Sequence, residues 1–457
     1  MSADVPAPGS PGASGWEQLL RSMLGPAADE VIEQLRAGGL DPADMPAIPG
    51  MPTEPAVIQQ VVAQVQRLMA AGGGDPVNWE VAHELARQQA GSGGDPSLGA
   101  AERRAVTDAF AVAELWLDAA TDLPPTAAPA RAWSRAEWVE ATLPTWRTLT
   151  EPIATSLVAA LGRAFGSTVR DEIGDTPLDV SGMVRTLGQT VFGLQVGQAV
   201  GSLARETFGA TDIGLPLLAV PAPALVPRNV GEFSEGLGVP ADEVRLFLAL
   251  REAAATRLVT HVPWLRAHLL GAVEAYARGI TVDTEQLEEA VRSVDVSDPA
   301  ALQAALSGGV FNPQVTPDQK AALERLETSL ALVEGWVDEV AAGAASPHLP
   351  HTVALREMLR RRRAAGGPAE QTFATLVGLQ LRPRRLRDAA ALWAAIAAEL
   401  GPAGRDAVWT HPDLMPNADD LDDPTGYATR RQATADESAD LDRALAEILG
   451  EQEPPAS

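Results

Sequence analysis

The chain has 457 residues, of which 46% are hydrophobic, and this is enough for two or three average domains or one large two-lobed domain. A net charge of −26 opposes binding to nucleic acids and anionic membranes, and the lack of cysteine excludes disulfides, thiolate metal sites and cysteine nucleophiles. Because the N-terminal segment has no basic region followed by an apolar run, we expect a cytoplasmic protein.

Composition and periodicity divide the chain into four regions. Residues 1–14 are rich in Pro, Gly, Ser and Ala, and we expect them to be disordered. Helical patterns fill residues 15–180, an N-terminal helical lobe, and continue through residues 181–410, a second lobe. Residues 411–457 carry twelve acids against three arginines. This acidic C-terminal tail should be loosely attached, with one short helix near 440–449. The predicted fold class is mainly α.

Three glycines recur at steps of four residues in the second lobe. Gly193, Gly197 and Gly201 therefore share one face of a predicted helix, where a second backbone can approach closely. A phosphate-binding interpretation is weaker, because such glycines lie in strand-to-helix turns rather than inside a helix. The surrounding residues 182–204 include Arg185 and three glutamines, too polar for a membrane span.

Residues 215–230, LPLLAVPAPALVPRNV, are the only strand-like region. They are apolar but interrupted by prolines, which allow at most a short edge strand or hairpin. In zinc peptidases a strand of this kind lies beside the active-site helix and holds extended substrate. We therefore expect a small β element next to the helix that follows.

That helix, predicted over residues 240–260, has the length and placement of the zinc-peptidase His-Glu-x-x-His helix. Such a helix needs histidines at positions i and i+4 to bind one ion, with a glutamate after the first histidine as general base. Here Glu252 fills the general-base position, while Arg251 and Ala255 stand at the two ligand positions. The pattern indicates a degenerate, vestigial site.

A second predicted helix, residues 317–342, carries Glu334 and Asp338 in the spacing Glu-x-x-x-Asp. In one class of zinc peptidases this glutamate is the third metal ligand, and the aspartate orients a ligand histidine. Arg251 lies on an apolar helix face and must find an anion there, because an unpaired buried charge is costly. We therefore expect its guanidinium to neutralise Glu334, together with Glu252 or Asp338, in place of the ion.

With these motifs in hand, the chain resembles a bacterial family of zincin-like hydrolases, often labelled zinc-dependent metalloproteases and related to proteins associated with the biosynthesis of a deazaflavin coenzyme. The resembling segments include FGLQVGQAVGSLARETFGATDIGLPL, LREAAATRLVTHVPWLRAHLLGAVEAYARGI and LALVEGWVDEV. The resemblance covers residues 74–424 and implies a zincin-like α+β fold. It also implies histidine at positions 251 and 255 and glutamate at 252 and 334. Only Glu252 and Glu334 match.

Other candidate residues lie outside this motif. His348 and His351 form a His-x-x-His pair in a proline-containing loop, so they are either substitute metal ligands or ordinary loop residues. His261 lies off the face that a ligand would need, and His83 is interpreted as a packed or surface residue. The stretch Arg356–Arg387 has nine arginines against two glutamates. It is either an anion or acidic-partner site or, preferably, a solvated or internally salt-bridged face.

Three functions remain open at this point. The preferred one is a non-catalytic zincin-like protein that binds a peptide or protein in its cleft, without cofactor or metal and without nucleic-acid or membrane partners. The second is an active zinc metallopeptidase with non-standard ligands. The third is a hydrolase that uses Glu252 without metal. The first is favoured because zinc catalysis normally requires three protein ligands.

Overall fold

The computed structural model of the protein describes residues 75–173, 180–278, 316–365, 376 and 385–450. Two compact units divide the chain, residues 1–75 and residues 76–457, and all described helices belong to the second unit. The expected disordered segment 1–14 lies outside the described residues.

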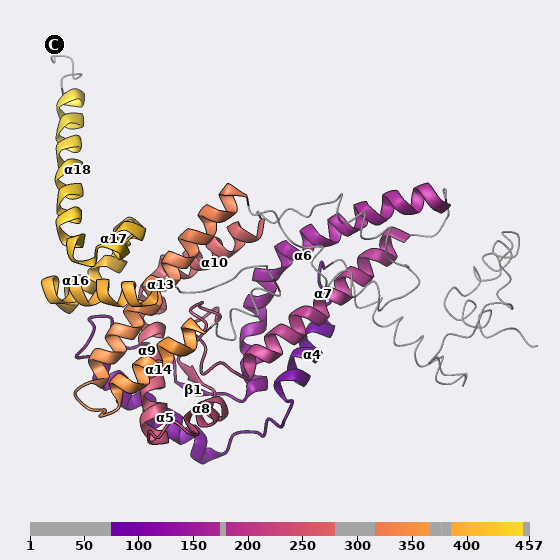
Figure 1. Ribbon diagram of the computed structural model, residues 1–457, viewed down its shortest axis with the longest axis horizontal. Helices are drawn as coiled ribbons and strands as arrows, with labels where there is room; N and C mark the ends of the chain where they lie inside the picture. Colours follow the sequence, from indigo (N-terminus) through magenta and orange to yellow (C-terminus); the bar gives the residue numbers. More distant parts are fainter. Residues whose placement is uncertain (1–74, 174–179, 279–315, 366–375, 377–384, 451–457) are drawn as a thin grey trace, which may run out of the picture. The chain divides into compact units, whose positions relative to one another are not determined.

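The second unit is built almost entirely from helices, which confirms the predicted mainly α class (Figure 1). The described α-helices are α4 (Trp79–Ala90), α5 (Ala100–Leu117), α6 (Arg135–Ile173), α7 (Val180–Ala204), α8 (Pro227–Ser234), α9 (Ala241–His261), α10 (Pro263–Arg278), α13 (Pro317–Ala345), α14 (Thr352–Ala364), α16 (Leu386–Ala407), α17 (Ala418–Asp422) and α18 (Tyr427–Gly450). None of them is both long and apolar enough to cross a membrane.

Helix α9 lies at the centre of this unit and packs against α5, α8, α10, α13 and α14. It begins after Pro240, and two acids in its first turn complement the positive end of the helix dipole. Its last residue, His261, comes shortly before Pro263. Of its 21 residues 13 are buried, which is typical of a helix enclosed on most sides. The predicted helix 240–260 is therefore confirmed and forms the core.

The three spaced glycines pack helix α7 against helix α4. A Cβ atom added at Gly193, Gly197 or Gly201 would lie 2.6 Å from a backbone carbonyl oxygen of α4 or its N-cap. Only hydrogen fits at that distance, so the two backbones touch along this face. The prediction of close packing is confirmed. Helices α4 and α6, which precede the expected lobe boundary at residue 180, both contact α7, which follows it. The packing is therefore continuous across that boundary.

In the part of the chain that the structure describes, the β structure consists of two short parallel strands, β1 (Arg131–Ala132) and β2 (Ala224–Leu225), and β2 contacts α9. An isolated antiparallel bridge joins Gly209 to Leu225 on the same segment. The expected short strand beside the central helix is present, in two of the residues of the predicted 215–230 region. Its partner β1 lies in a proline-rich connection where no strand was predicted.

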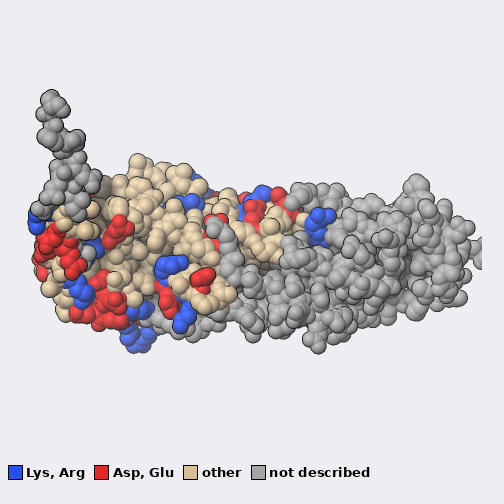
Figure 2. Space-filling model, turned by 90° about the horizontal axis from the view of Figure 1, so that it is seen from above, with Lys and Arg blue, Asp and Glu red and all other residues tan. Residues whose placement is uncertain are grey.

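The C-terminal region is more ordered than the expected tail with one short helix. Helix α18 begins at Tyr427, whose side chain is buried together with that of Leu421. Arg385, at the start of α16, pairs with Asp422 at 2.5 Å and so attaches this region to the arginine stretch. Figure 2 shows acidic and basic side chains side by side at one end of the described part.

Candidate functional site

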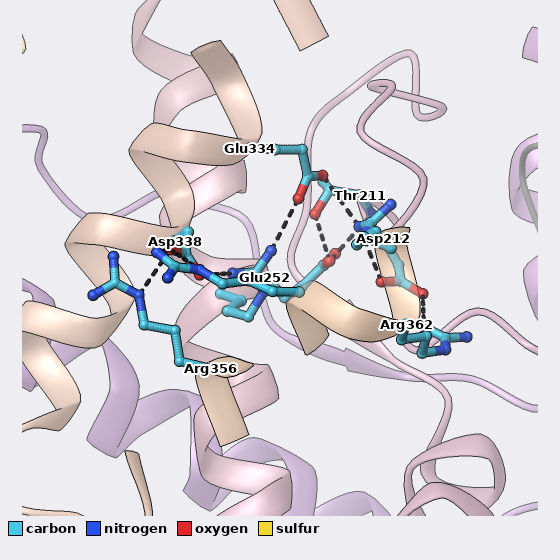
Figure 3. Close-up of polar contacts among 10 residues, drawn as sticks. Thr211, Asp212, Glu252, Glu334, Asp338, Arg356 and Arg362 are labelled. Atoms are coloured by element: carbon cyan, nitrogen blue, oxygen red, sulfur yellow. Dashed lines mark hydrogen bonds and ion pairs between the residues drawn. The ribbon is translucent and has the colours of Figure 1, made fainter. Parts of the chain in front are cut away.

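Arg251 links the central helix to α13. Its guanidinium donates to Glu334 at 2.9 Å and to Asp338 at 3.4 Å. The two carboxylates are one helical turn apart on α13, and their side chains are only 6% and 1% exposed. Figure 3 shows the polar contacts around these acids. Helical spacing places the two acids on one face of α13, and the packing of α9 against α13 brings Arg251 to them, as the sequence predicted.

Glu252 points to the other side, toward the turn before β2. One carboxylate oxygen accepts from the backbone N–H groups of Ala210 (2.9 Å) and Ala224 (3.4 Å). The other accepts from the N–H (3.1 Å) and the hydroxyl (2.6 Å) of Thr211. Glu252 thus binds three backbone positions to α9. Of the two alternative second partners expected for Arg251, Asp338 is the one found among the described ion pairs, and Glu252 is not.

Burial raises the pKa of Glu252 to about 7, although the hydrogen bonds from Thr211, Ala210 and Ala224 act to lower it. The surrounding backbone is tightly fitted to this carboxylate. A Cβ atom at Gly209 would lie 2.6 Å from a Glu252 oxygen and 2.5 Å from the carbonyl oxygen of Ala224. The carboxylate therefore acts as a fixed cross-link between α9 and the β element.

Helix α14 adds four further arginines to the site. Arg356 and Arg360 donate to Asp338 at 2.8 and 2.6 Å. Arg363 donates to Glu334 at 3.1 Å and to Asp212 at 3.3 Å, and Arg362 to Asp212 at 3.4 Å. The preferred interpretation of the arginine stretch as an internally salt-bridged face is confirmed for these four.

Asp212, which the sequence analysis did not single out, joins this network from the turn after α7. Burial alone would raise its pKa, but Arg362 and Arg363, together with the backbone N–H of Phe208, hold the pKa of Asp212 below its ordinary value. The Arg362 guanidinium also lies 4.0 Å from the centre of the Phe208 ring, in cation–π geometry. Asp212 is therefore ionised and anchors the C-terminal end of α14.

A shallow depression that is open to solvent lies among these groups. Its walls come from α9, α13, α14 and the segment 208–225. A second, apolar depression lies farther along α9 and shares Thr211 with the first. The pair forms a charged depression with an apolar neighbour, and Arg363 of α14 is part of the charged wall.

The residues at the expected metal position do not fit a zinc ion. Ala255 offers no donor atom, Arg251 presents a cation, and both oxygens of Glu252 already accept two hydrogen bonds each. Glu334 alone of the resembling ligand set remains, whereas zinc requires three protein ligands in catalytic sites. Within the described ranges, no group of three or more His, Cys, Asp or Glu residues is placed to hold a metal.

The four histidines considered in the sequence analysis lie elsewhere. His348 stacks on Trp116 with 4.3 Å between ring centres, and His351 contacts Glu243 at 3.0 Å. His83 contacts Glu140 at 2.7 Å on the surface, as expected for a surface residue. His261 is exposed at the end of α9. None of the four lines the charged pocket.

Comparisons with known proteins identify the fold. The chain is similar over 78% of its length to 99% of the chain in a crystal structure described as "a putative hydrolase with a novel fold" from Chloroflexus aurantiacus, with 19% identity and a TM-score of 0.54. No curated protein matches the sequence. The sequence model of the family described as "Zincin-like metallopeptidase" matches residues 77–428, which include the central helix, α13 and α14. The chain therefore belongs to the zincin-like metallopeptidase family.

Proposed function

We propose that this protein is a zincin-like binding module that has lost zinc and peptide hydrolysis and holds a peptide or protein segment in its cleft. One observation carries the proposal: the Arg251 guanidinium pairs with Glu334 and Asp338 at the place where the family resemblance puts the metal. A guanidinium there supplies the positive charge that buried carboxylates need. It cannot polarise a carbonyl or activate water as a metal does.

The position of Glu252 supports the same proposal. A general base must reach the proton of a water molecule with a free oxygen lone pair. The four donors around Glu252 come from backbone and hydroxyl groups at 2.6–3.4 Å. Its oxygens are therefore engaged in structure, and the residue matches a retained scaffold element better than a working base.

A second candidate is a metal-free hydrolase, and one observation favours it. The pKa of Glu252, raised to about 7 by burial, lies in the range that suits general acid–base catalysis, and Glu252 lines the charged pocket. This function would require at least one of the four hydrogen bonds to open. The strength of that network places the candidate second.

The partner is proposed to be a peptide or protein rather than a nucleic acid or a membrane. The net charge of −26 repels phosphate groups. Of the pocket-lining residues, three are acids and two are arginines. No cofactor is expected in this proposal, whereas a zinc ion is required by the alternative of an active metallopeptidase with non-standard ligands.

The metal content of the purified full-length chain tests the proposal. The protein is dialysed against excess zinc, then against zinc-free buffer, and zinc is counted by elemental mass spectrometry. We expect well below one zinc per chain, and no effect of chelators on thermal stability. Stoichiometric zinc that is lost in Glu334→Gln would overturn the proposal. Chelator-resistant hydrolysis of a peptide library that disappears in Glu252→Gln would instead establish the second candidate.

A further inference from the structure

Three of the four arginines through which helix α14 contacts the site lie on one side of the helix. Arg356, Arg360 and Arg363 are spaced at i, i+4 and i+7 and therefore share a helix face, and all three pair with acids of the site. Arg361, between them in sequence, is 76% exposed and contacts only Glu357 of its own helix among the described ion pairs. These three arginines form one face toward α13, and Arg362 adds a contact with Asp212 near the C-terminal end of the helix.

The surface beneath this face is acidic. It presents Asp212 from the turn after α7 and Glu334, Asp338 and Glu339 from α13. Among the described ion pairs, Arg251 is the cation outside α14 that contacts these carboxylates. Glu334 and Asp338 are too deeply buried to remain charged without cations nearby. The cleft therefore has the chemistry of a receptor for closely spaced positive charges.

Arginine fits this receptor better than lysine does. Arg360 donates to one Asp338 oxygen from both its Nε and an Nη atom, at 3.1 and 2.6 Å. Arg363 bridges Glu334 and Asp212, which belong to different elements. The flat Arg362 guanidinium covers the Phe208 ring. Forked donors and a planar cation are properties of arginine.

We propose that α14 occupies the cleft as an internal ligand and that the external partner is an arginine-rich protein segment that takes its place. This inference rests on the proposed binding function and names the partner class of the same cleft. The apolar attachment of α14 is small, since Leu355 and Leu359 are buried while Val353 is 80% exposed. Ion pairs supply most of the docking contacts, so a segment with the same arginine spacing can form the same contacts, although it must overcome the high effective concentration of the tethered α14.

A peptide-binding experiment tests this. The probe is a fluorescently labelled synthetic peptide with the sequence of residues 352–365, and its binding to the full-length protein is followed by anisotropy. The variant Arg360→Ala/Arg363→Ala loosens α14 and should bind the probe with a Kd at least about ten-fold lower than the wild type does, equivalent to about 1.4 kcal/mol. The matched control Arg361→Ala removes an exposed arginine from the same helix and should bind the probe as the wild type does. A probe with every arginine replaced by glutamine should not bind.

Equal affinity of the probe for wild type and double variant, or equal binding of the glutamine probe, would overturn the inference. Hydrogen exchange on the wild type gives an independent measurement if the double variant does not fold. Added salt should speed amide exchange in α14 but not in α16, because salt weakens the ion pairs. Unchanged exchange in α14 would also overturn the inference. A zinc-loaded wild type would refute the binding module itself, whereas a zinc-free protein with no gain in probe affinity would refute only the role of α14.

Discussion

Replacing Arg251 with alanine is expected to lower the free energy of unfolding by about 2–3 kcal/mol. Removal of one partner from a buried ion pair costs about 3–5 kcal/mol when the other charge is left alone. Here Glu334 keeps Arg363, and Asp338 keeps Arg356 and Arg360. The cost should therefore fall to roughly that of a hydrogen bond to a charged group, about 1.5–3 kcal/mol, plus lost packing of the aliphatic stem.

The assay is urea unfolding of the full-length protein, followed by the fluorescence of its ten tryptophans. A shift of the midpoint at constant slope reports a change in stability alone. The matched control is Arg245→Ala on the same helix. Its ion pair with Asp242 is exposed on the acid side, where the Asp242 side chain is 87% accessible. Such a pair contributes at most about 1 kcal/mol.

A loss in Arg251→Ala no larger than that in Arg245→Ala would refute the view that Arg251 takes over the charge role of the metal. A double-mutant cycle sharpens the test. If Arg251 acts through Glu334, the variant Arg251→Ala/Glu334→Gln should lose less stability than the sum of the single losses, by about 1–3 kcal/mol. Strict additivity would show that the 2.9 Å contact contributes nothing.

Three further predictions concern packing, pH and metal binding. Gly197→Ala should destabilise the folded protein by about 1–3 kcal/mol, because its Cβ would meet a carbonyl oxygen of α4 at 2.6 Å. The control Gly271→Ala has open space around the added Cβ and should be neutral or stabilising. Urea unfolding midpoints measure both effects, and equal effects would contradict the packing argument. Burial raises the pKa of Glu252 from 4.5 to about 7, so the folded state binds this proton more tightly than the unfolded state does. The contribution of Glu252 to stability is therefore greatest below pH 4.5. It falls by up to about 3 kcal/mol as the pH rises from 4.5 through 7. The difference between wild type and Glu252→Gln across that range measures it, and a flat difference would refute the shift. Arg251→His/Ala255→His should gain one zinc by elemental mass spectrometry, and failure to gain it would mean that the scaffold no longer holds the ligand geometry.

The parts of the fold set by local sequence were predictable. The prolines on either side of the central helix fix where it begins and ends, so the expected range 240–260 agrees with the observed Ala241–His261 to within one residue. The glycine step of four gave the contact face of α7 because helical periodicity alone fixes it. By contrast, β1 could not be found. It exists only because Arg131 and Trp133 donate backbone hydrogen bonds to Pro223 and Leu225, about ninety residues away, and no local propensity signals such a pairing.

The contacts of the site likewise include some that the sequence predicts and others that it does not. Arg251, Glu334 and Asp338 were expected together because one helix carries the arginine and the other carries both acids one turn apart. The targets of α14 were not predictable. The spacing of its arginines indicates a face, but that face meets Asp212, which lies some 150 residues earlier in a turn without a recognisable motif. The sequence offered only an aspartate shortly after a glycine-rich helix, which does not by itself indicate a partner.

The division of Glu334 between two arginines bears on the proposed exchange of a metal site for a salt-bridge network. Arg251 binds Oε2 and Arg363 binds Oε1, so the two guanidiniums do not compete for one oxygen. Loss of Arg251 frees Oε2 while Arg363 continues to hold the carboxylate in place. Histidines at positions 251 and 255 would then meet one free carboxylate oxygen, the donor set that a catalytic zinc requires. Under this proposal, a metal site and the salt-bridge network differ only in the residues at the two ligand positions of α9, and the other ion pairs of the network are kept.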